Sequence, residues 1–334
     1  MRAVYIDAAE RIRVEEVAVP EPGSGQVRIK VDHVGICGSD LHYYFEGANG
    51  AFVVREPLIP GHEMSGRVDF DPAGKWAPGT PVTIHPARFG KSDEKYADRP
   101  HLWKGGSYFG SASTWPHTQG AMADYIIVED RMVRPLPDGL PIKRAALSEP
   151  LGVAIHAINQ AEGVEGHRVL VTGAGPIGLC VAAASIARGA ASVTVSDVTP
   201  GARDRAQRLG VDRVLDARTE APEDGAFDVV FECSANPVGI SGAFRAVRPA
   251  GTVIQVGMVP DANISINLAP FVSKEVTYRS TFRFKDEVTD AVAMLEENPQ
   301  IESVITHDFT VDEVVEAFNV ARDSDASGKV LVSF

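Results

Sequence analysis

The sequence predicts a two-domain α/β protein, in which a mostly-β part precedes a doubly wound parallel sheet. Before Pro141 the chain is rich in glycine, proline and short alternating segments, and after Pro141 strand-like and helix-like segments alternate regularly. The chain has 334 residues, of which 44% are hydrophobic. At roughly 100–200 residues per domain, this length fits two domains with full cores.

The mostly-β part contains two segments, Gln26–Ile36 and Ala123–Glu129, that read as strands bounded by turn residues. At the other end of the chain, two amphipathic helices are expected near Asp286–Glu297 and Val311–Arg322, followed by a final strand, Lys329–Phe334. Because this tail follows a completed six-strand unit, we expect it to pack back on the first part. The predicted domains are therefore 1–147 with 284–334, and 148–283.

The middle of the chain alternates between the two kinds of element. One helix starts with Pro176 in its first turn, and a second runs from Pro200 to Gly210. Between and after them lie apolar runs that predict buried strands, at Arg168–Gly173, Ser192–Asp197, Phe227–Cys233, Gly251–Met258 and Val276–Phe282. Alternation of this kind indicates a parallel sheet with helices on both faces.

Charge and cysteine content exclude several functional classes. The formal net charge of −13 repels nucleic-acid phosphates and anionic membranes, so any anionic substrate must be met by local positive charge. No apolar signal-peptide core is present, and the longest apolar run, Pro176–Ala187, is too short to cross a bilayer. Three cysteines form a poor disulfide framework. A cytoplasmic protein with no nucleic-acid or membrane partner is expected.

A glycine-rich motif indicates a dinucleotide site. Gly173-Ala174-Gly175-Pro176-Ile177-Gly178 follows a predicted strand and opens a helix, so its backbone can approach a pyrophosphate at the helix N-terminus. Asp197 ends the next strand, where an acid grips the ribose hydroxyls of NAD, while Arg203 leaves NADP open. The expected cofactor-binding residues are Gly173, Gly175, Pro176, Ile177, Gly178, Asp197, Arg203, Val256, Gly257 and Met258. The alternative is a glycine-rich loop without a ligand.

Four side chains could hold a metal ion. A thiolate, an imidazole and a carboxylate suit tetrahedral zinc with one position left open, and Cys37, His62, Glu63 and Glu149 supply these groups. Taken singly, each has a structural alternative: a buried cysteine, a hydrogen-bonded turn histidine, or surface carboxylates.

Four segments together resemble one family. GICGSDLHYYFEG, YFGSASTWPHTQGAMADY, LSEPLGVAIHA and STFRF, with GHE and GAGPIG, resemble the zinc-dependent medium-chain dehydrogenases. The resemblance covers the whole chain and is greatest for the sorbitol dehydrogenase branch, within it for L-idonate 5-dehydrogenases. It implies a GroES-like catalytic domain and a Rossmann coenzyme domain.

The resemblance also implies residue roles. Cys37, His62 and Glu63 match the catalytic zinc ligands, and Glu149 matches a carboxylate that holds a water at the metal or exchanges with Glu63 as ligand. Tyr43, Arg283 and Glu149 are the expected substrate contacts. A proton would leave through Ser39 and His42 or through Glu149, and Asp40 is expected to accept a hydrogen bond from the His62 ring.

Two departures from the family pattern affect these expectations. Phe284 stands where sorbitol dehydrogenases often have a tyrosine, which removes a hydroxyl. The lobe after Val82–Ala87, which holds a four-cysteine structural zinc in many members, contains no cysteine here. We therefore expect one catalytic zinc and no structural zinc, with His101 of this lobe exposed to solvent.

The expected reaction is oxidation of a secondary hydroxyl, from L-idonate to 5-keto-D-gluconate, with hydride transfer to NAD(P). Three alternatives remain: a sorbitol, xylitol or galactitol dehydrogenase, a zinc-free reductase of the same fold, and a non-catalytic dinucleotide-binding protein. A homodimer or homotetramer is expected, with the last strands of the nucleotide-binding sheet in contact.

Overall fold

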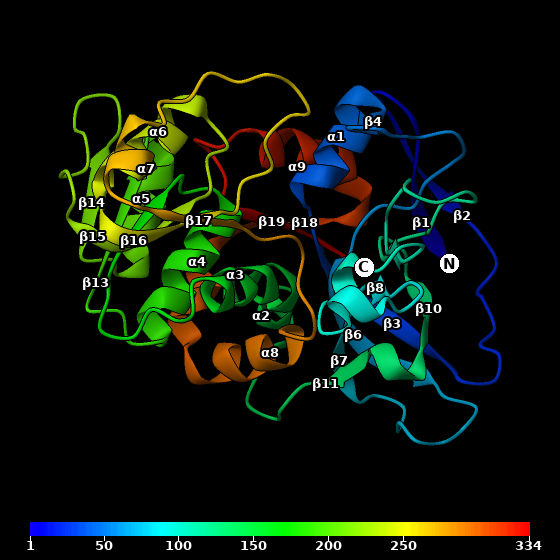
Figure 1. Ribbon diagram of the computed structural model, residues 1–334. Helices are drawn as coiled ribbons and strands as arrows, with labels where there is room; N and C mark the ends of the chain where they lie inside the picture. Colours follow the sequence, from blue (N-terminus) through cyan, green and yellow to red (C-terminus); the bar gives the residue numbers. More distant parts are fainter.

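The computed structural model describes all residues from Met1 to Phe334 and contains two large sheets (Figure 1). The first has seven strands in the order β11-β7-β6-β3-β19-β18, with β10 paired to β3. Its strands are β3 (Gln26–Gly35), β6 (Glu63–Phe70), β7 (Pro81–Ile84), β10 (Tyr125–Glu129), β11 (Val133–Pro135), β18 (Ile305–Thr310) and β19 (Lys329–Ser333). The two strands expected in this part of the chain are confirmed, with β10 beginning two residues later than expected.

Smaller elements surround this sheet. Helix α1 (Gly38–Glu46) follows β3 directly and is followed by the short strands β4 (Ala48–Asn49) and β5 (Phe52–Val53). The remaining short elements are β1 (Arg2–Ala8), β2 (Arg11–Glu16), β8 (Ala87–Arg88), β9 (Ser107–Tyr108), η1 (Glu94–Tyr96), η2 (Pro100–Leu102) and η3 (Asp130–Met132).

The second sheet is parallel throughout, in the order β14-β13-β12-β15-β16-β17. Numbered along the chain, this is the order 3-2-1-4-5-6 of dinucleotide-binding sheets, so the predicted Rossmann fold is confirmed. The strands are β12 (Arg168–Thr172), β13 (Ser192–Asp197), β14 (Arg213–Asp216), β15 (Phe227–Glu232), β16 (Val247–Gln255) and β17 (Thr277–Ser280), and the helices between them are α4 (Pro176–Ala187), α5 (Pro200–Leu209), α6 (Pro237–Ala246) and α7 (Ala269–Ser273).

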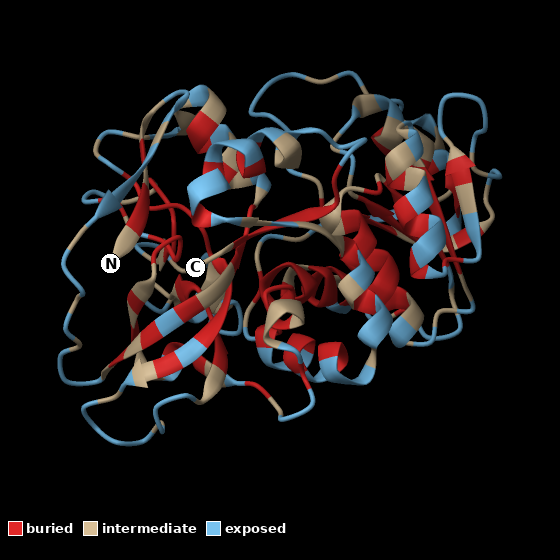
Figure 2. Cartoon of the chain, turned by 180° about the vertical axis from the view of Figure 1, so that it is seen from behind, coloured by how far each residue is buried: buried red, intermediate tan, exposed pale blue.

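Burial differs between the sheets in the way that their connections require. Strand β3 alternates between buried and more accessible residues, whereas four of the five residues of β12 are buried. Seen from behind, the first sheet shows exposed and buried residues in turn along its strands (Figure 2). This contrast follows from helices covering both faces of the parallel sheet.

The C-terminal segment divides between two hydrophobic cores. Strands β18 and β19 and helix α9 (Val314–Arg322), preceded by η5 (Val311–Glu313), return to the first sheet, where β19 pairs with β3. Helix α8 (Val288–Glu297) and η4 (Pro299–Val304) instead belong to the core that contains α2 (Ile142–Ala145), α3 (Ser148–Gln160) and α4. The tail therefore ties the two sheets together, rather than packing only on the first.

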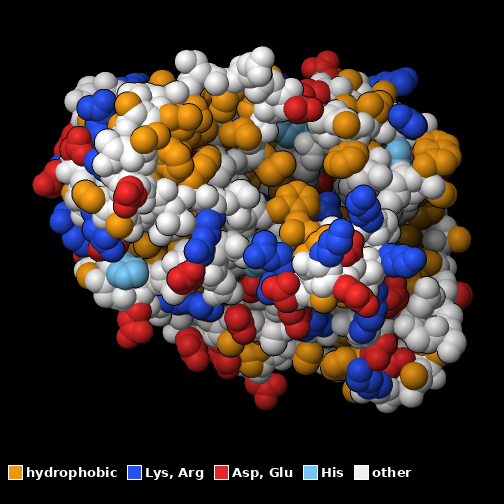
Figure 3. All heavy atoms as spheres, in the orientation of Figure 1, with side chains coloured by type: hydrophobic (Ala, Val, Ile, Leu, Met, Phe, Trp, Pro, Cys, Tyr) orange, Lys and Arg blue, Asp and Glu red, His pale blue; other side chains and the backbone are white.

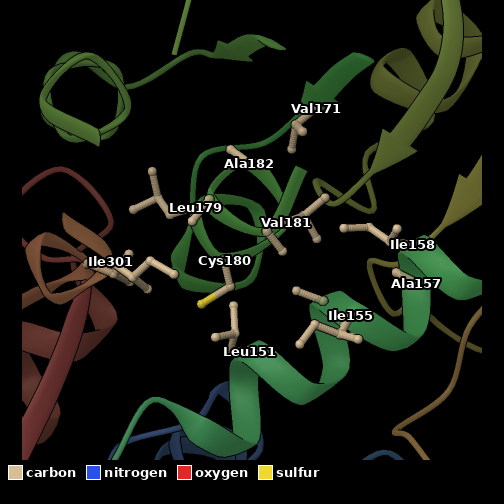
Figure 4. Packing of buried hydrophobic residues seen from close by; sticks show 14 of the residues in the cluster. Leu151, Ile155, Ala157, Ile158, Val171, Leu179, Cys180, Val181, Ala182 and Ile301 are labelled. Atoms are coloured by element: carbon tan, nitrogen blue, oxygen red, sulfur yellow. The ribbon is translucent and has the colours of Figure 1, made fainter. Parts of the chain in front are cut away.

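Cys180 illustrates the density of that second core. Its side chain lies among Leu151, Leu179 and Ile301, from three different elements (Figure 4). Burial raises the pKa of its thiol to about 12, so Cys180 acts as a small apolar residue, as the sequence indicated. None of the helices is both long and apolar enough to traverse a lipid bilayer.

Candidate metal centre and dinucleotide site

Three predicted ligands come together at the junction of β3 and β6. Cys37 is the N-cap of α1, immediately beyond β3, and His62 and Glu63 lie at the start of β6. Because β3 and β6 are paired neighbours, with Gly35 opposite Glu63, two ligands 25 residues apart meet. One ligand atom from each of the three side chains lies within 4.8 Å of the others.

Asp40 holds this arrangement through backbone groups. Its carboxylate accepts hydrogen bonds from the amides of Cys37 and Gly61, both at 3.0 Å. The Nδ1 atom of His62 has no hydrogen-bond partner, so the expected bond from the His62 ring to Asp40 is wrong. The Asp40 carboxylate is instead occupied by these two backbone amides. It thereby fixes the backbone at Cys37 and at Gly61, the residue before His62.

The charges of this group suit a divalent cation. Burial opposes a charge on His62, but the neighbouring Cys37 side chain raises the pKa of His62 to about 10. Glu63 is fully buried. Sulfur, nitrogen and oxygen donors in a shared buried space form a set that zinc prefers, and the proton on His62 would be released when a metal binds.

Glu149 lies beside this group but outside the set of three. It stands at the start of α3, and its carboxylate accepts a 2.5 Å hydrogen bond from the Tyr108 hydroxyl. The Tyr108 ring meets the His62 ring edge-on, with centroids 5.3 Å apart. Burial raises the pKa of Glu149 against the opposing charge of His62. Sequence reasoning did not single out Tyr108, which lies within a resembling segment but belongs to no metal or acid–base pattern.

Arg283 stacks on the Tyr108 ring. Its guanidinium carbon lies 4.2 Å from the Tyr108 ring centroid and 5.0 Å from that of Phe282. No carboxylate pairs with it, which leaves its fork of donors available beside Tyr108, whose hydroxyl binds Glu149.

The glycine motif has the geometry that a pyrophosphate needs. Gly173 has a φ of 91°, and a Cβ on Gly178 would lie 1.9 Å from the Gly173 carbonyl oxygen. A Cβ on Gly175, in contrast, would meet no atom within 4 Å, so this residue borders open space at the start of α4. The first and third glycines thus serve the turn and the packing, and the second leaves room for a ligand.

Asp197 ends β13 next to this turn. Its carboxylate accepts hydrogen bonds from the Ala174 amide at 2.7 Å and from the Thr199 amide at 2.8 Å. Arg203 bonds the carbonyl oxygens of Asp197 and Val198 and pairs with Asp216 at 3.0 Å. The acid is therefore held in place at the strand end, and the arginine is already neutralised by a carboxylate.

Comparison with known proteins agrees with this geometry. Residues 23–138 match the alcohol dehydrogenase GroES-like domain, and residues 176–297 match the zinc-binding dehydrogenase domain. The chain is 32% identical to L-idonate 5-dehydrogenase (NAD(P)(+)) of Escherichia coli K12, over 100% of this chain and 98% of that protein. It belongs to the zinc-dependent medium-chain dehydrogenases.

Two further relatives support this membership. The chain is 33% identical to sorbitol dehydrogenase of Macaca fascicularis, over 93% of this chain and 90% of that protein. The crystal structure of L-idonate 5-dehydrogenase from Escherichia coli superimposes with a TM-score of 0.93 at 29% identity, covering 100% and 98% of the two chains. As a zinc-binding dehydrogenase of the polyol and sugar-acid branch, the protein is an oxidoreductase acting on CH–OH groups, with zinc and NAD(P) as cofactors.

The structure of this dehydrogenase adds a second residue that sequence reasoning missed. Lys329, the first residue of β19, is buried, and its ammonium donates to Glu63 at 2.7 Å and to the Ile36 carbonyl at 3.0 Å. Burial disfavours this charge, but Glu63 and Cys37 raise the pKa of Lys329. A lysine that opens an otherwise apolar strand is a signal that could have revealed it, since buried lysines need a partner.

The other predicted catalytic and substrate-contacting residues of this region lie on helix α1. Tyr43 is buried, and its hydroxyl accepts from the Ala112 amide at 3.1 Å and lies 3.3 Å from the Ser111 hydroxyl. Ser39 is half-buried, and His42 is hydrogen-bonded to Glu46 at 2.9 Å on an exposed face. No hydrogen bond joins Ser39 to His42.

Two expectations outside the metal group need correction. Phe284 is buried and packs edge-on against His85, with ring centroids 5.0 Å apart, so the interior takes up the ring and does not present it to a substrate. His101 is not fully exposed, because its ring packs against His156 of α3 at 4.9 Å. Burial beside His156 lowers the pKa of His101 to about 4. The cysteine-free lobe therefore docks on the second core through this contact.

Proposed function

We propose that this dehydrogenase oxidises L-idonate at C5 to 5-keto-D-gluconate, with hydride transfer to NAD(P). The observation that carries the proposal is the joint position of the three candidate ligands, Glu149 and Arg283. A guanidinium without an acidic partner stands beside a donor set suited to zinc, in a protein whose net charge is −13. The full-length similarity to L-idonate 5-dehydrogenase supports this substrate.

Each of these residues has a proposed task. Cys37, His62 and Glu63 would hold zinc, with Glu149 as an exchanging ligand, and zinc would supply Lewis-acid polarisation of the substrate hydroxyl. Glu149, whose carboxylate accepts a hydrogen bond from the Tyr108 hydroxyl, would move a proton away from the reacting group. Ser39 and His42 form the second proposed proton path.

The substrate and the dinucleotide would be oriented by separate groups. Tyr43 and Arg283 would contact the substrate, and Arg283 beside Tyr108 would offer its donors to a carboxylate or to hydroxyls. The dinucleotide would rest on Gly173–Gly178, with Asp197 at the ribose and Val256–Met258 along the opposite wall. The proposed domains are 1–147 with 284–334, and 148–283, with α8 and η4 of the first packed on the core of the second.

A steady-state comparison tests the proposal. L-idonate and sorbitol are each offered to the zinc-loaded enzyme with NAD and with NADP, and the C5 ketone is identified in the product. A kcat/KM for L-idonate at least about tenfold above that for sorbitol supports the proposal, since tenfold corresponds to about 1.4 kcal/mol of discrimination. A preference for sorbitol would overturn it.

A polyol dehydrogenase acting on sorbitol, xylitol or galactitol is the second candidate, favoured by the similarity to sorbitol dehydrogenase. The same metal group would serve these substrates, and the buried position of Phe284 removes the main sequence argument against sorbitol. Absence of turnover on both the aldonates and the polyols would instead favour a non-catalytic dinucleotide-binding protein.

We also propose that the protein forms a homodimer or homotetramer through the β17 edge of the parallel sheet. All four residues of β17 are exposed, including Tyr278. Hydrophobic side chains gather on the surface over α6 and α7 (Figure 3), among them Val238 and Val272. An exposed edge with adjoining apolar residues is typical of a surface that another chain covers, and sedimentation analysis of the purified protein tests this.

A further inference from the structure

A pocket lies beside the chain segment that follows α1. Its walls come from the β4–β5 segment and from the loop that follows β9, and its volume is about 160 Å³. Aromatic, hydroxyl and basic side chains line it, namely Phe52, Arg55, Ser113, Thr114, Trp115 and His117. Figure 1 shows the position of β4, and Figure 3, in the same orientation, shows basic side chains beside hydrophobic ones on the surface there.

The pocket is connected to the proposed reaction site by one segment of chain. Tyr108 of this segment bonds Glu149, and Ala112, four residues later, lines the pocket. The Ala112 amide donates to the Tyr43 hydroxyl, so the pocket wall is fixed to the helix that begins at Cys37. One segment of chain therefore bonds Glu149 through Tyr108 and lines the pocket from Ala112 onward.

A chain of hydroxyl groups links Tyr43 to the pocket. The Tyr43 hydroxyl lies 3.3 Å from the Ser111 hydroxyl, which donates to the Ser113 hydroxyl at 2.9 Å. Ser113 itself lines the pocket. Side chains of this kind both donate and accept, so they match the hydroxyls of a polyol chain.

His117 holds the two walls of the pocket together. Its buried ring accepts the Arg55 amide on Nε2 at 2.9 Å, so Nδ1 carries the proton and donates to the Thr114 carbonyl at 3.0 Å. The His117 amide in turn donates to the Glu56 carboxylate at 2.6 Å. These bonds fix the Arg55 backbone. The carboxylate of Glu56, the next residue, is occupied by the His117 amide.

Arg55 is the one lysine or arginine that lines this pocket, and its exposed guanidinium pairs with no carboxylate. With a net charge of −13 on the protein, an anionic group entering the pocket would find its positive charge here. The planar fork of a guanidinium binds a carboxylate with two parallel hydrogen bonds.

We infer that this pocket is the subsite for the terminal carboxylate of the substrate and that Arg55 is the residue that selects an aldonate over an alditol. The inference rests on the proposed function, in which the reacting hydroxyl stands at the metal group. In a 5-hydroxy aldonate, the carboxylate lies four carbon–carbon bonds from that hydroxyl, toward the far end of the molecule. Arg283, stacked on Tyr108, would then serve the hydroxyls near the reacting carbon.

The test compares two substrates that differ only in the terminal group, L-idonate and L-iditol, in the zinc-loaded enzyme. The measured quantity is the ratio of their kcat/KM values for the wild type and for Arg55→Gln, Arg55→Lys and Arg245→Gln. Arg245 is an exposed arginine of α6 without an ion pair, and serves as the matched control. Arg55→Gln should lower the ratio by about 10- to 100-fold, as loss of a charge-assisted hydrogen bond does.

The other variants separate charge from packing. Arg55→Lys should recover part of the ratio, and Arg245→Gln should leave it within about twofold of the wild type. An unchanged ratio in Arg55→Gln would overturn the inference, even where the wild type oxidises L-idonate as proposed. A higher Arg55-dependent preference for a polyol phosphate than for L-idonate would overturn the assignment to a carboxylate.

A binding measurement distinguishes failure of the inference from failure of the proposed function. L-idonate and L-iditol are titrated calorimetrically into the zinc-loaded enzyme with NADH present, a combination in which neither can react. Tighter binding of L-idonate that disappears in Arg55→Gln supports the subsite even for a wild type that turns over neither compound. Equal affinities for both ligands in the wild type would overturn it.

Discussion

Replacing Lys329 by methionine is the sharpest test of how the metal group is balanced. The ammonium of Lys329 lies 2.7 Å from Glu63 in the interior, which at an effective dielectric constant of about 20 is an attraction of about 6 kcal/mol. Removing one partner of such a buried pair costs about 3–5 kcal/mol, because the other charge is left without compensation. We expect the zinc-free Lys329→Met protein to lose stability of this order.

Zinc should reverse much of this loss. In the variant, a bound divalent cation can neutralise Glu63, and no ammonium competes for the carboxylate. We expect zinc binding to restore at least about 1.4 kcal/mol of the stability lost in the variant. Since 1.4 kcal/mol is a factor of ten in an equilibrium constant, the zinc affinity of the variant should rise by about tenfold or more. Competition with a chromophoric zinc chelator measures this affinity, and melting temperatures with zinc and with a chelator measure the stability.

Two controls accompany this variant. Lys329→Arg keeps the charge and should keep zinc affinity near that of the wild type, while the double variant Glu63→Gln/Lys329→Met removes both charges and should regain stability without zinc. Zinc affinity that is unchanged or lower in Lys329→Met would refute the reasoning, because Lys329 and the metal would then not share Glu63.

Three further predictions concern the metal, the dinucleotide and pH. Cys37→Ala should lose zinc and turnover but keep NADH binding, as measured by metal analysis and fluorescence titration; full zinc content in the variant would contradict the ligand role. Gly178→Ala, whose Cβ would lie 1.9 Å from the carbonyl of the motif's first glycine, should lower the melting temperature and abolish NADH binding, whereas Gly175→Ala should fold normally and weaken only NADH binding. In the folded protein the pKa of His101 is lowered from 6.5 to about 4 and that of Glu287, bonded to His156, from 4.5 to about 2, so the unfolded state binds more protons and stability falls as pH drops through each interval. Melting temperatures should therefore fall less steeply between about pH 6.5 and 4 in His101→Gln and between about pH 4.5 and 2 in Glu287→Gln, and parallel curves for variants and wild type would contradict this.

Much of the fold could be predicted because its signals are local. The strand before Gly173, the helix beginning at Pro176 and Asp197 at the end of the next strand are each read from a short window of sequence, and all are observed. Helix α8 was also predicted as a helix, but the prediction that it packs on the first part of the chain was wrong. An amphipathic pattern indicates that one face is buried and does not say against which core.

The candidate site shows the same division. Donor chemistry and family resemblance indicated Cys37, His62 and Glu63 as candidate metal ligands, and the pairing of β3 with β6 accounts for their proximity. The expected partner of His62 was wrong, because the choice between a ring nitrogen and a backbone amide depends on atomic positions. Tyr108 was missed for the same reason, since nothing in its own surroundings along the chain indicates a bond to Glu149.

The sequence by itself determined the order of the elements, the dinucleotide turn and the chemical types of the metal donors, because these depend on residue identity and short spacings. Only the tertiary structure decided that Lys329, 266 residues after Glu63, supplies its counter-charge and that Arg55 and Trp115 line one pocket. Such contacts depend on the pairing of β19 with β3 and on the course of a long loop, and no local pattern encodes either.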